Sequence, residues 1–269
     1  MKTHIPIGLT IAGSDSGGGA GIQADLKAFS ALGVYGASVI TAITAQNTRA
    51  VTAVHDVPVD VIAAQLEAVL SDLNVQAIKI GMLSSPSIIT AVADKLSAFD
   101  GPVVLDPVMV SKSGARLLQP DALDALRSKL IPLAAVVTPN LPEAADITGT
   151  EETEDEAALN AQAEAILAMG AGAVLMKGGH ASGDICIDAL HTMGAAPMHF
   201  SAPRVSTKNT HGTGCTYSAS IAAGLAKGQS LNDAVTQAHA YLSKAIVAAD
   251  SLSVGQGHGP VHHFHDLWS

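Results

Sequence analysis

Cysteine, aromatic residues and positive charge are all scarce in this sequence. The only two cysteines, Cys186 and Cys215, are too few for a disulfide framework, so we expect a cytoplasmic, reducing setting. Aromatic residues make up 3% of the chain, which leaves a core mostly of Ala, Val, Leu and Ile. Lys and Arg number 14 against 24 Asp and Glu, and the net charge of −10 argues against a nucleic-acid partner.

Long apolar runs are absent as well. Although 48% of the residues are hydrophobic, no run approaches the ~20 residues that span a bilayer, so we expect no membrane partner. The first apolar stretch is interrupted by Pro6 and Gly8, which indicates a strand and a loop rather than a signal peptide. Since no Gly/Ser-rich or Pro-rich linker divides the 269 residues, we expect a single domain over 1–269.

Short apolar runs alternate with helical patterns along the whole chain. The runs that read as strands are 7–12, 39–45, 77–80, 103–105, 135–137, 173–176, 184–190 and 198–200. The helical patterns between and after them are 22–32, 61–73, 88–96, 122–130, 157–169, 213–227 and 231–249. This order predicts an α/β fold, with a central, mostly parallel sheet that is flanked by helices on both faces.

Polar residues and glycines stand where several of these strands end. They are Asp15, Gly81, Asp106, Asn140 and Lys177. The carboxyl ends of parallel strands lie along one edge of a sheet, and ligands of such folds bind at that edge. The sequence therefore predicts one site built from the loops that follow the strands.

The tetrapeptide Gly212-Thr213-Gly214-Cys215 opens an alanine-rich helical pattern. Uncovered N–H groups at such a helix start bind phosphate-like anions, and the helix dipole would lower the pKa of the Cys215 thiol. The segment predicts chemistry on a phosphoryl group with a thiol nearby. The alternative is a turn before a packed helix with a buried cysteine.

Four further polar residues suit a phosphate and metal site. Lys177 precedes two glycines, a position from which it would neutralise ATP phosphates, or else it snorkels to the surface. Asn140, Glu143 and Asp106 would hold Mg²⁺ partly through water. Glu143, in the first turn of a helix with Pro142, is, taken alone, better explained as a helix-capping acid.

Two residues near the start of the chain suit a small polar ligand. Gln46 follows an apolar strand, and its amide offers the donor and the acceptor that fit the edge of a heterocycle. Asp25, if turned inward, would accept hydrogen bonds from a ligand amine. Loop solvation for Gln46 and a surface position for Asp25 are the alternatives.

Three histidines, His262, His263 and His265, cluster near the end of the sequence. They have no acidic or cysteine partner at the spacing of metal ligands. We therefore expect a polar tail segment rather than a metal site.

Seven motifs together resemble the hydroxymethylpyrimidine/phosphomethylpyrimidine kinase family of thiamine biosynthesis. In chain order they are AGSD at 12–15 with GGAGIQAD at 18–25, TAQNT at 44–48, KIGM at 79–82, DPVM at 106–109, TPNLPE at 138–143, MKGGH at 176–180 and KNTHGTGC at 208–215. They keep the order of the family and span nearly the whole chain. The resemblance implies a ribokinase-like fold and a homodimer.

The resemblance also implies two reactions at one site. One ATP phosphorylates the hydroxymethyl group of the pyrimidine, and a second ATP converts the monophosphate to the diphosphate. The residues implied around the pyrimidine are Gly13, Asp25, Gln46, Met82 and Val108. Lys177, Thr213 and Gly214 would contact ATP phosphates, Asp106, Asn140 and Glu143 would serve Mg²⁺ and its water shell, and residues 212–215 would form the anion hole for the γ-phosphoryl group.

The sequence leaves open which group is the catalytic base and which vitamin is phosphorylated. Most ribokinase-like sugar kinases carry an aspartate where Cys215 stands, so the thiolate either takes the hydroxyl proton or only shapes the hole. A pyridoxal-type kinase is the nearest alternative function, since the two vitamin rings are similar in size, although Gln46 and Met82 favour the pyrimidine. A non-catalytic nucleotide- or pyrimidine-binding regulator is the alternative from another class, but Lys177 and the glycine-rich hole are both retained.

Overall fold

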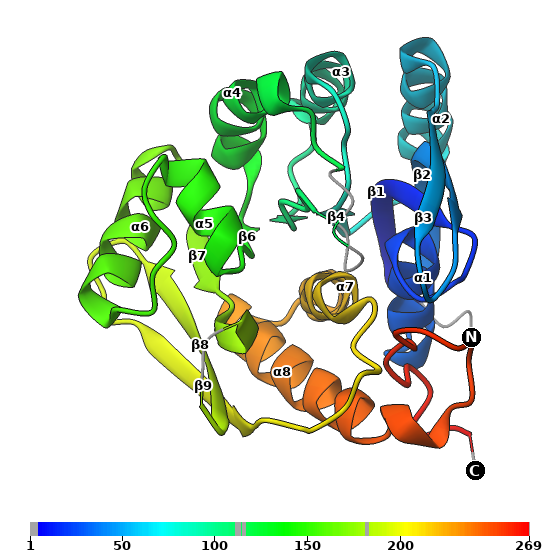
Figure 1. The fold of residues 1–269 in the computed structure, drawn as a ribbon. Coiled ribbons are helices and arrows are strands. Elements are labelled where there is room, and N and C mark those ends of the chain that lie inside the picture. Colours follow the sequence, from blue (N-terminus) through cyan, green and yellow to red (C-terminus); the bar gives the residue numbers. More distant parts are fainter. Residues whose placement is uncertain (1–4, 111–113, 115–116, 181–182, 269) are drawn as a thin grey trace.

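The computed structural model describes residues 5–110, 114, 117–180 and 183–268. Within them a nine-stranded sheet has the order β3-β2-β1-β4-β5-β6-β7-β8-β9 (Figure 1). Its parallel part consists of β1 (Ile7–Asp15), β2 (Tyr35–Gln46), β4 (Ala77–Ile80), β5 (Val103–Leu105), β6 (Val136–Val137) and β7 (Ala173–Met176). The antiparallel strands are β3 (Val51–Asp56) at one edge and β8 (Ile185–Thr192) and β9 (Met198–Pro203) at the other. The mostly parallel sheet that the sequence predicts is confirmed.

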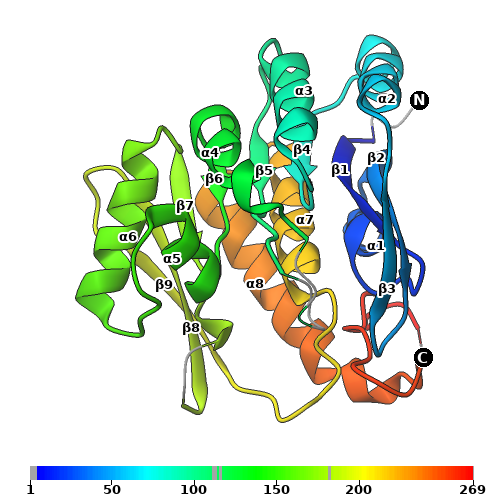
Figure 2. The same cartoon turned by 45° about the horizontal axis from the view of Figure 1, so that its top comes forward.

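Helices cover both faces of this sheet (Figure 2). One face carries α2 (Val59–Asp72), α3 (Pro86–Leu96), α4 (Leu123–Ala125), α5 (Leu141–Thr148) and α6 (Glu156–Ala168). The other face carries α1 (Gly21–Ala31), α7 (Thr213–Ala226) and α8 (Leu231–Val247). Side chains alternate between the faces along each strand. Ile78 and Val103 therefore join the first core cluster, while their neighbours Ala77 and Val104 join the second.

Two segments differ from the expectation. Strand β3 has no counterpart in the predicted elements, because it lies at the sheet edge with residues 52–55 exposed and so lacks a buried apolar run. The helix expected over 122–130 is a series of short turns, including a π turn at Leu126–Leu130. The turns run from Pro120 to Leu133, and the regular hydrogen bonding of an α-helix is interrupted at Pro132, which has no N–H group to donate.

The parallel strands bring their carboxyl ends to one edge, where α7 begins. Beyond β6 and β7 the pairing continues as an isolated bridge between Asn140 and Lys177. This bridge places side chains from two successive loops next to each other, as the strand-end argument predicts. No helix in the described part of the chain is long and apolar enough to cross a membrane.

Candidate active site

A cleft of about 1270 Å³ opens at the carboxyl edge of the sheet. All of the predicted site residues except Asp25 line it. They come from the carboxyl ends of β1 and β2, from the loops after β4, β5, β6 and β7, and from the starts of α5 and α7. Those residues are Gly13, Gln46, Met82, Asp106, Val108, Asn140, Glu143, Lys177, Gly212, Thr213, Gly214 and Cys215.

The start of α7 has the backbone expected of an anion hole. Within the described residues no side chain caps this helix, whereas Ser85, Asn140, Asp155 and Ser230 cap α3, α5, α6 and α8. The cap residue Gly212 has φ +79°, and a side chain there would meet the carbonyl oxygen of Gly19 at 1.8 Å. Only glycine fits this position. The Thr213 N–H donates to Thr210 O at 3.3 Å, and no side chain of the described residues competes with a ligand for the N–H groups of Gly214 and Cys215 that follow.

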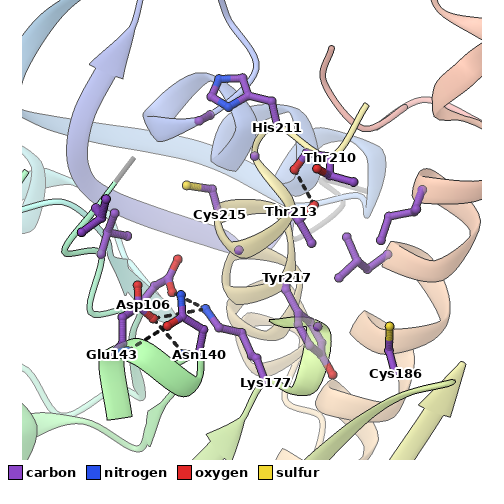
Figure 3. A pocket seen from close by; sticks show the side chains of 18 of the residues that line it. Asp106, Asn140, Glu143, Lys177, Cys186, Thr210, His211, Thr213, Cys215 and Tyr217 are labelled. Atoms are coloured by element: carbon purple, nitrogen blue, oxygen red, sulfur yellow. Dashed lines mark hydrogen bonds and ion pairs between the residues drawn. The ribbon is translucent and has the colours of Figure 1, made fainter. Parts of the chain in front are cut away.

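Lys177 points into the site rather than to the surface, so the snorkelling alternative is wrong (Figure 3). Its Nζ lies 2.9 Å from Asp106 Oδ1 and 3.9 Å from Glu143 Oε2. A side chain on Gly214 would come within 3.4 Å of both Lys177 Nζ and Asp106 Oδ2. The start of α7 and the Lys177–Asp106 pair therefore face each other across the space left by this glycine. Burial raises the pKa of Asp106, but the nearby Lys177 and Lys79 ammonium groups outweigh it and hold the pKa below its usual value.

Asn140 and Glu143 form a reciprocal cap at the start of α5. The Glu143 N–H donates to Asn140 Oδ1 at 2.9 Å, and the Asn140 N–H donates to Glu143 Oε2 at 2.8 Å. The capping role considered from the sequence is therefore confirmed. Burial raises the pKa of Glu143 to about 7, against the opposing effect of Lys177.

The acidic residues fit a hydrated Mg²⁺ ion better than a fully protein-bound one. In the described ranges no group of three or more His, Cys, Asp or Glu residues is placed to hold a metal. Mg²⁺ keeps several waters and binds through one or two carboxylates together with substrate phosphates. Asp106 and Glu143, which both line the cleft beside Lys177, supply such carboxylates.

Cys215 lies at the third position of α7 and lines the cleft. The sequence predicts a lowered thiol pKa there, and the structure corrects this. Burial raises the pKa of Cys215 to about 11, and the carboxylates of Asp25 and Asp106 add to the increase, although Lys79 opposes it. The helix dipole does not prevail because the thiol is desolvated near two negative charges.

Asp25 was expected at the ligand, but its side chain is fully buried beside β1 and does not line the cleft. Its carboxylate accepts hydrogen bonds from Lys79 Nζ at 2.8 and 2.9 Å and from Thr10 Oγ1 at 2.6 Å. Lys79, which lines the cleft, was missed by the sequence analysis. The available signal was a lysine within the apolar strand Ala77–Ile80, because a buried lysine needs a buried acid.

Asp15 and His211 join the first glycine-rich loop to the loop before α7, and this pair was also missed. The Asp15 carboxylate accepts hydrogen bonds from the N–H groups of Gly17, Gly19 and Ala20. Its Oδ2 also lies 2.8 Å from His211 Nε2. His211 directly precedes Gly212, so the two loops are held together where the hole begins.

The cluster of histidines is not a polar tail. His263 is only 4% exposed, and its Nε2 lies 2.9 Å from Thr216 Oγ1 in α7. Burial and the repulsion of the Lys27 ammonium lower the pKa of His263 to about 3. In the same segment, the His211 N–H donates to Gly259 O and the Val261 N–H donates to His211 O. This late segment therefore holds the loop that precedes α7.

The cleft continues beyond Lys177 between β8, β9 and α8. Side chains of Cys186, Asp188, Tyr217 and His239 line this second half. The sequence carries no signal for a ligand here, since these residues belong to no phosphate or metal pattern. The cleft is larger than a pyrimidine requires and has room for a second, larger ligand.

Comparisons with known proteins agree with this geometry. The family model described as phosphomethylpyrimidine kinase matches residues 15–262. A hydroxymethylpyrimidine/phosphomethylpyrimidine kinase of Rhizobium meliloti is 62% identical over 97% of this chain and 98% of its own. Among solved structures, a pyridoxal kinase of Bacillus subtilis in complex with ADP has a TM-score of 0.90 at 37% identity, over 99% of this chain and 100% of that one. A phosphomethylpyrimidine kinase of Clostridium difficile has a TM-score of 0.79 at 46% identity, over 90% and 100%. The chain belongs to the phosphomethylpyrimidine kinase family.

Proposed function

We propose that this protein uses ATP to phosphorylate hydroxymethylpyrimidine and then its monophosphate, giving the diphosphate for thiamine biosynthesis. The observation that carries the proposal is the uncapped start of α7 facing the Lys177–Asp106 pair across Gly214. A phosphoryl group in transfer needs backbone donors and a cation around it, and both are present here. Family membership supports the same reaction class.

The phosphate side of the site neutralises charge. Lys177 contacts the phosphates of ATP, and Gly212, Thr213, Gly214 and Cys215 form the hole for the γ-phosphoryl group. Mg²⁺ would be held by Asp106 and Glu143, with Asn140, partly through water, and it would neutralise the phosphate oxygens. Because Asp106 is already paired with Lys177, the lysine and the acids are positioned before the nucleotide arrives.

The acceptor side holds the ring. Gly13, Met82 and Val108 line it together with Gln46. A side chain at Gly13 would meet Met82 Sδ at 3.0 Å, so glycine keeps the ring space open. Asp25 acts from behind this wall, through Lys79, instead of touching the pyrimidine.

The proposed role of Cys215 is to shape the anion hole. A thiol with a pKa of about 11 is almost entirely protonated at neutral pH, so it makes a poor base. The hydroxyl proton then passes to a phosphate oxygen late in the transfer. This choice follows the second of the two alternatives that the sequence left open.

The chain is further proposed to act as one domain over 1–269, as a homodimer in the cytoplasm. One continuous sheet with a core cluster on each face supports the single domain. Exposed apolar side chains at the β2–β3 edge, including Tyr35, Ile43 and Val54, support self-association. Sedimentation of the purified protein tests the dimer, and a monomer at micromolar concentration would contradict it.

A coupled ADP-release assay with hydroxymethylpyrimidine and with pyridoxal tests the function. We expect faster turnover on the pyrimidine, with two ADP per pyrimidine and a diphosphate product by mass spectrometry. Pyridoxal kinase activity is the second candidate, favoured by the 37% identity to the Bacillus subtilis structure. Faster turnover on pyridoxal would replace the first proposal by the second, and ligand binding without ADP formation would indicate a regulator.

A further inference from the structure

Asp188, on β8, is a buried carboxylate that the proposed function does not use. Its side chain lines the second half of the cleft, although the residue is only 9% exposed. Its Oδ1 accepts a hydrogen bond of 2.9 Å from the N–H group of Gly178, the residue that follows Lys177. Burying a carboxylate costs free energy unless it is hydrogen-bonded, so this contact ties Asp188 to the backbone next to Lys177.

This hydrogen bond lies where the ladder between β7 and β8 ends. The last pair of that antiparallel ladder is Met176 with Ala189. Two residues later the chain enters a 3₁₀ turn over Gly178–His180. A side chain on Gly178 would meet the carbonyl oxygen of Ile187 at 1.9 Å, so the turn packs directly against β8. The Asp188 carboxylate therefore binds the N–H group that faces β8 at the point where the strand turns away.

The backbone around Lys177 is thereby held from both sides. The Lys177 N–H donates to Pro139 O at 2.9 Å, which joins it to the loop after β6, and the next N–H donates to Asp188, which joins it to β8. A side chain points where the backbone on either side of it directs its first bond, and supporting hydrogen bonds fix that backbone. These two contacts therefore direct the Lys177 ammonium group to Asp106 Oδ1, 2.9 Å away.

We propose that Asp188 is a positioning residue for the use of ATP, which holds the backbone after Lys177 so that the ammonium group meets the phosphates. It acts through its acceptor oxygen and not through its charge. Burial in fact disfavours the charge and raises the pKa of Asp188, although the Gly178 N–H, His239 and the Tyr217 hydroxyl oppose this. The inference rests on the proposed function, since it concerns how the lysine of that same site is placed.

The first test measures kcat/KM for ATP in three variants. Asp188→Ala removes the acceptor, and we expect a fall of about tenfold or more, while calorimetry shows pyrimidine binding close to the wild-type value. Asp188→Asn keeps an oxygen that accepts from the Gly178 N–H, so kcat/KM for ATP should stay within about threefold of the wild type. Asp72→Ala, at the exposed end of α2, is the matched control and should equal the wild type. Equal losses in the Ala and Asn variants would overturn the proposal.

A double variant separates positioning from general damage to the fold. Since Asp188 acts through Lys177, adding Asp188→Ala to Lys177→Met should lower kcat/KM for ATP by less than about twofold beyond Lys177→Met alone. A merely structural role for Asp188 would lower kcat/KM by the same factor with and without Lys177, and that result would also overturn the proposal. If Asp188→Ala does not fold, Asp188→Ser replaces it, because the serine oxygen stops one bond short of the carboxylate oxygens.

A second measurement follows the hydrogen bond itself and needs no substrate. Glycine follows lysine at only two places in the sequence, 177–178 and 227–228, so ¹³C-carbonyl lysine with ¹⁵N-glycine gives two amide signals by NMR. Gly228→Ala, with open space around it, removes one signal and so assigns both. In Asp188→Ala the Gly178 amide should exchange with solvent about tenfold faster or more, while the Gly228 amide, which donates to a backbone carbonyl, stays unchanged. Unchanged exchange at Gly178 would overturn the inference.

The failure of this inference and that of the proposed function give different results. If the wild type forms no ADP with either vitamin, the proposed function fails. Calorimetry with a non-hydrolysable ATP analogue then replaces the kinetic test, and we expect Asp188→Ala to bind it about tenfold or more weakly than Asp188→Asn does. Equal binding of the analogue by the two variants would overturn the role of Asp188 whether or not the enzyme is a pyrimidine kinase.

Discussion

The ammonium group of Lys79 lies 2.8 Å from the carboxylate of Asp25, and both side chains are completely buried. Thr10 donates a further hydrogen bond to the same carboxylate. Gly81 is required beside the pair, because a side chain there would meet Lys79 Nζ at 2.7 Å. Lys79 also lines the cleft, so this ion pair holds a residue of the cleft wall in place.

Lys79→Met should be strongly destabilising, because it leaves the Asp25 carboxylate buried without its cation. We expect a loss of about 3–5 kcal/mol in the free energy of unfolding, measured by urea denaturation. Lys79→Met combined with Asp25→Leu should recover most of that loss. Lys95→Met breaks the exposed pair with Glu67 and should leave the urea midpoint nearly unchanged. A single Lys79 variant as stable as the wild type would contradict this account.

Gly212→Ala and Gly214→Ala should fail in different ways. Alanine at 212 meets a backbone oxygen at 1.8 Å and strains a left-handed backbone, so we expect a lower melting temperature and little activity. Alanine at 214 meets Lys177 and Asp106 only at 3.4 Å, so the fold should persist. Its methyl group enters the proposed phosphoryl space, so kcat should fall by about tenfold or more. Equal melting temperatures for the two variants would show that the Gly212 argument is wrong.

Cys215→Ala tests the role of the thiol. Because the pKa of Cys215 is raised to about 11, the thiolate is a trace species at neutral pH. We expect kcat within about tenfold of the wild type and the same pH–rate profile between pH 6 and 9. Iodoacetamide should label Cys215 slowly at pH 7.5, as followed by mass spectrometry. A loss of kcat on the order of 1000-fold would contradict this prediction and would indicate that the thiol is the catalytic base.

Lys177→Met removes the cation between Asp106 and the proposed phosphates. We expect kcat/KM for ATP to fall by about 100-fold or more, while binding of the pyrimidine, measured by calorimetry, stays close to the wild-type value. Unchanged ATP kinetics would exclude Lys177 from the phosphate site.

His263 should make stability depend on pH. Its pKa is lowered to about 3 in the fold, so the neutral ring is favoured there, and the unfolded chain binds more protons below its ordinary pKa of 6.5. Stability is therefore present above about pH 6.5 and is lost as the pH falls. Between pH 7 and 5 we expect the wild type to lose about 2 kcal/mol more than His263→Gln in urea titrations. Parallel losses in the two proteins would exclude this role.

The sequence predicts the positions of the glycine-rich helix start and of Lys177 well. Glycines at a helix start and a lysine after a buried strand have local signatures, and the parallel sheet brings them to one edge. Lys177 and residues 212–215 therefore lie where strand-end reasoning expects them. The same reasoning predicts the sheet and most of its helices, because apolar periodicity records burial on each face.

The contacts between distant segments could not be predicted in this way. Asp25 and Lys79 are 54 residues apart, and Asp15 and His211 are 196 apart. The sequence does not show which residues pair, and only the fold reveals that the members of each pair are in contact and buried. The predicted lowering of the Cys215 pKa was wrong for the same reason, since this pKa depends on burial in the fold and then on carboxylates from α1 and from the loop after β5.

The contacts of the loop before α7 also determine when, during synthesis of the chain, this loop can take its final position. The side chain of Asn209 accepts a hydrogen bond from the N–H group of Gly259, which lies 50 residues later in the chain. At about 5–20 residues per second, the ribosome needs roughly 3–10 s to make that interval. During this time the loop around Asn209 already exists, but the segment around Gly259 that contacts it does not. The loop before α7 therefore reaches its final contacts only after strands β1 to β9 have all been synthesised.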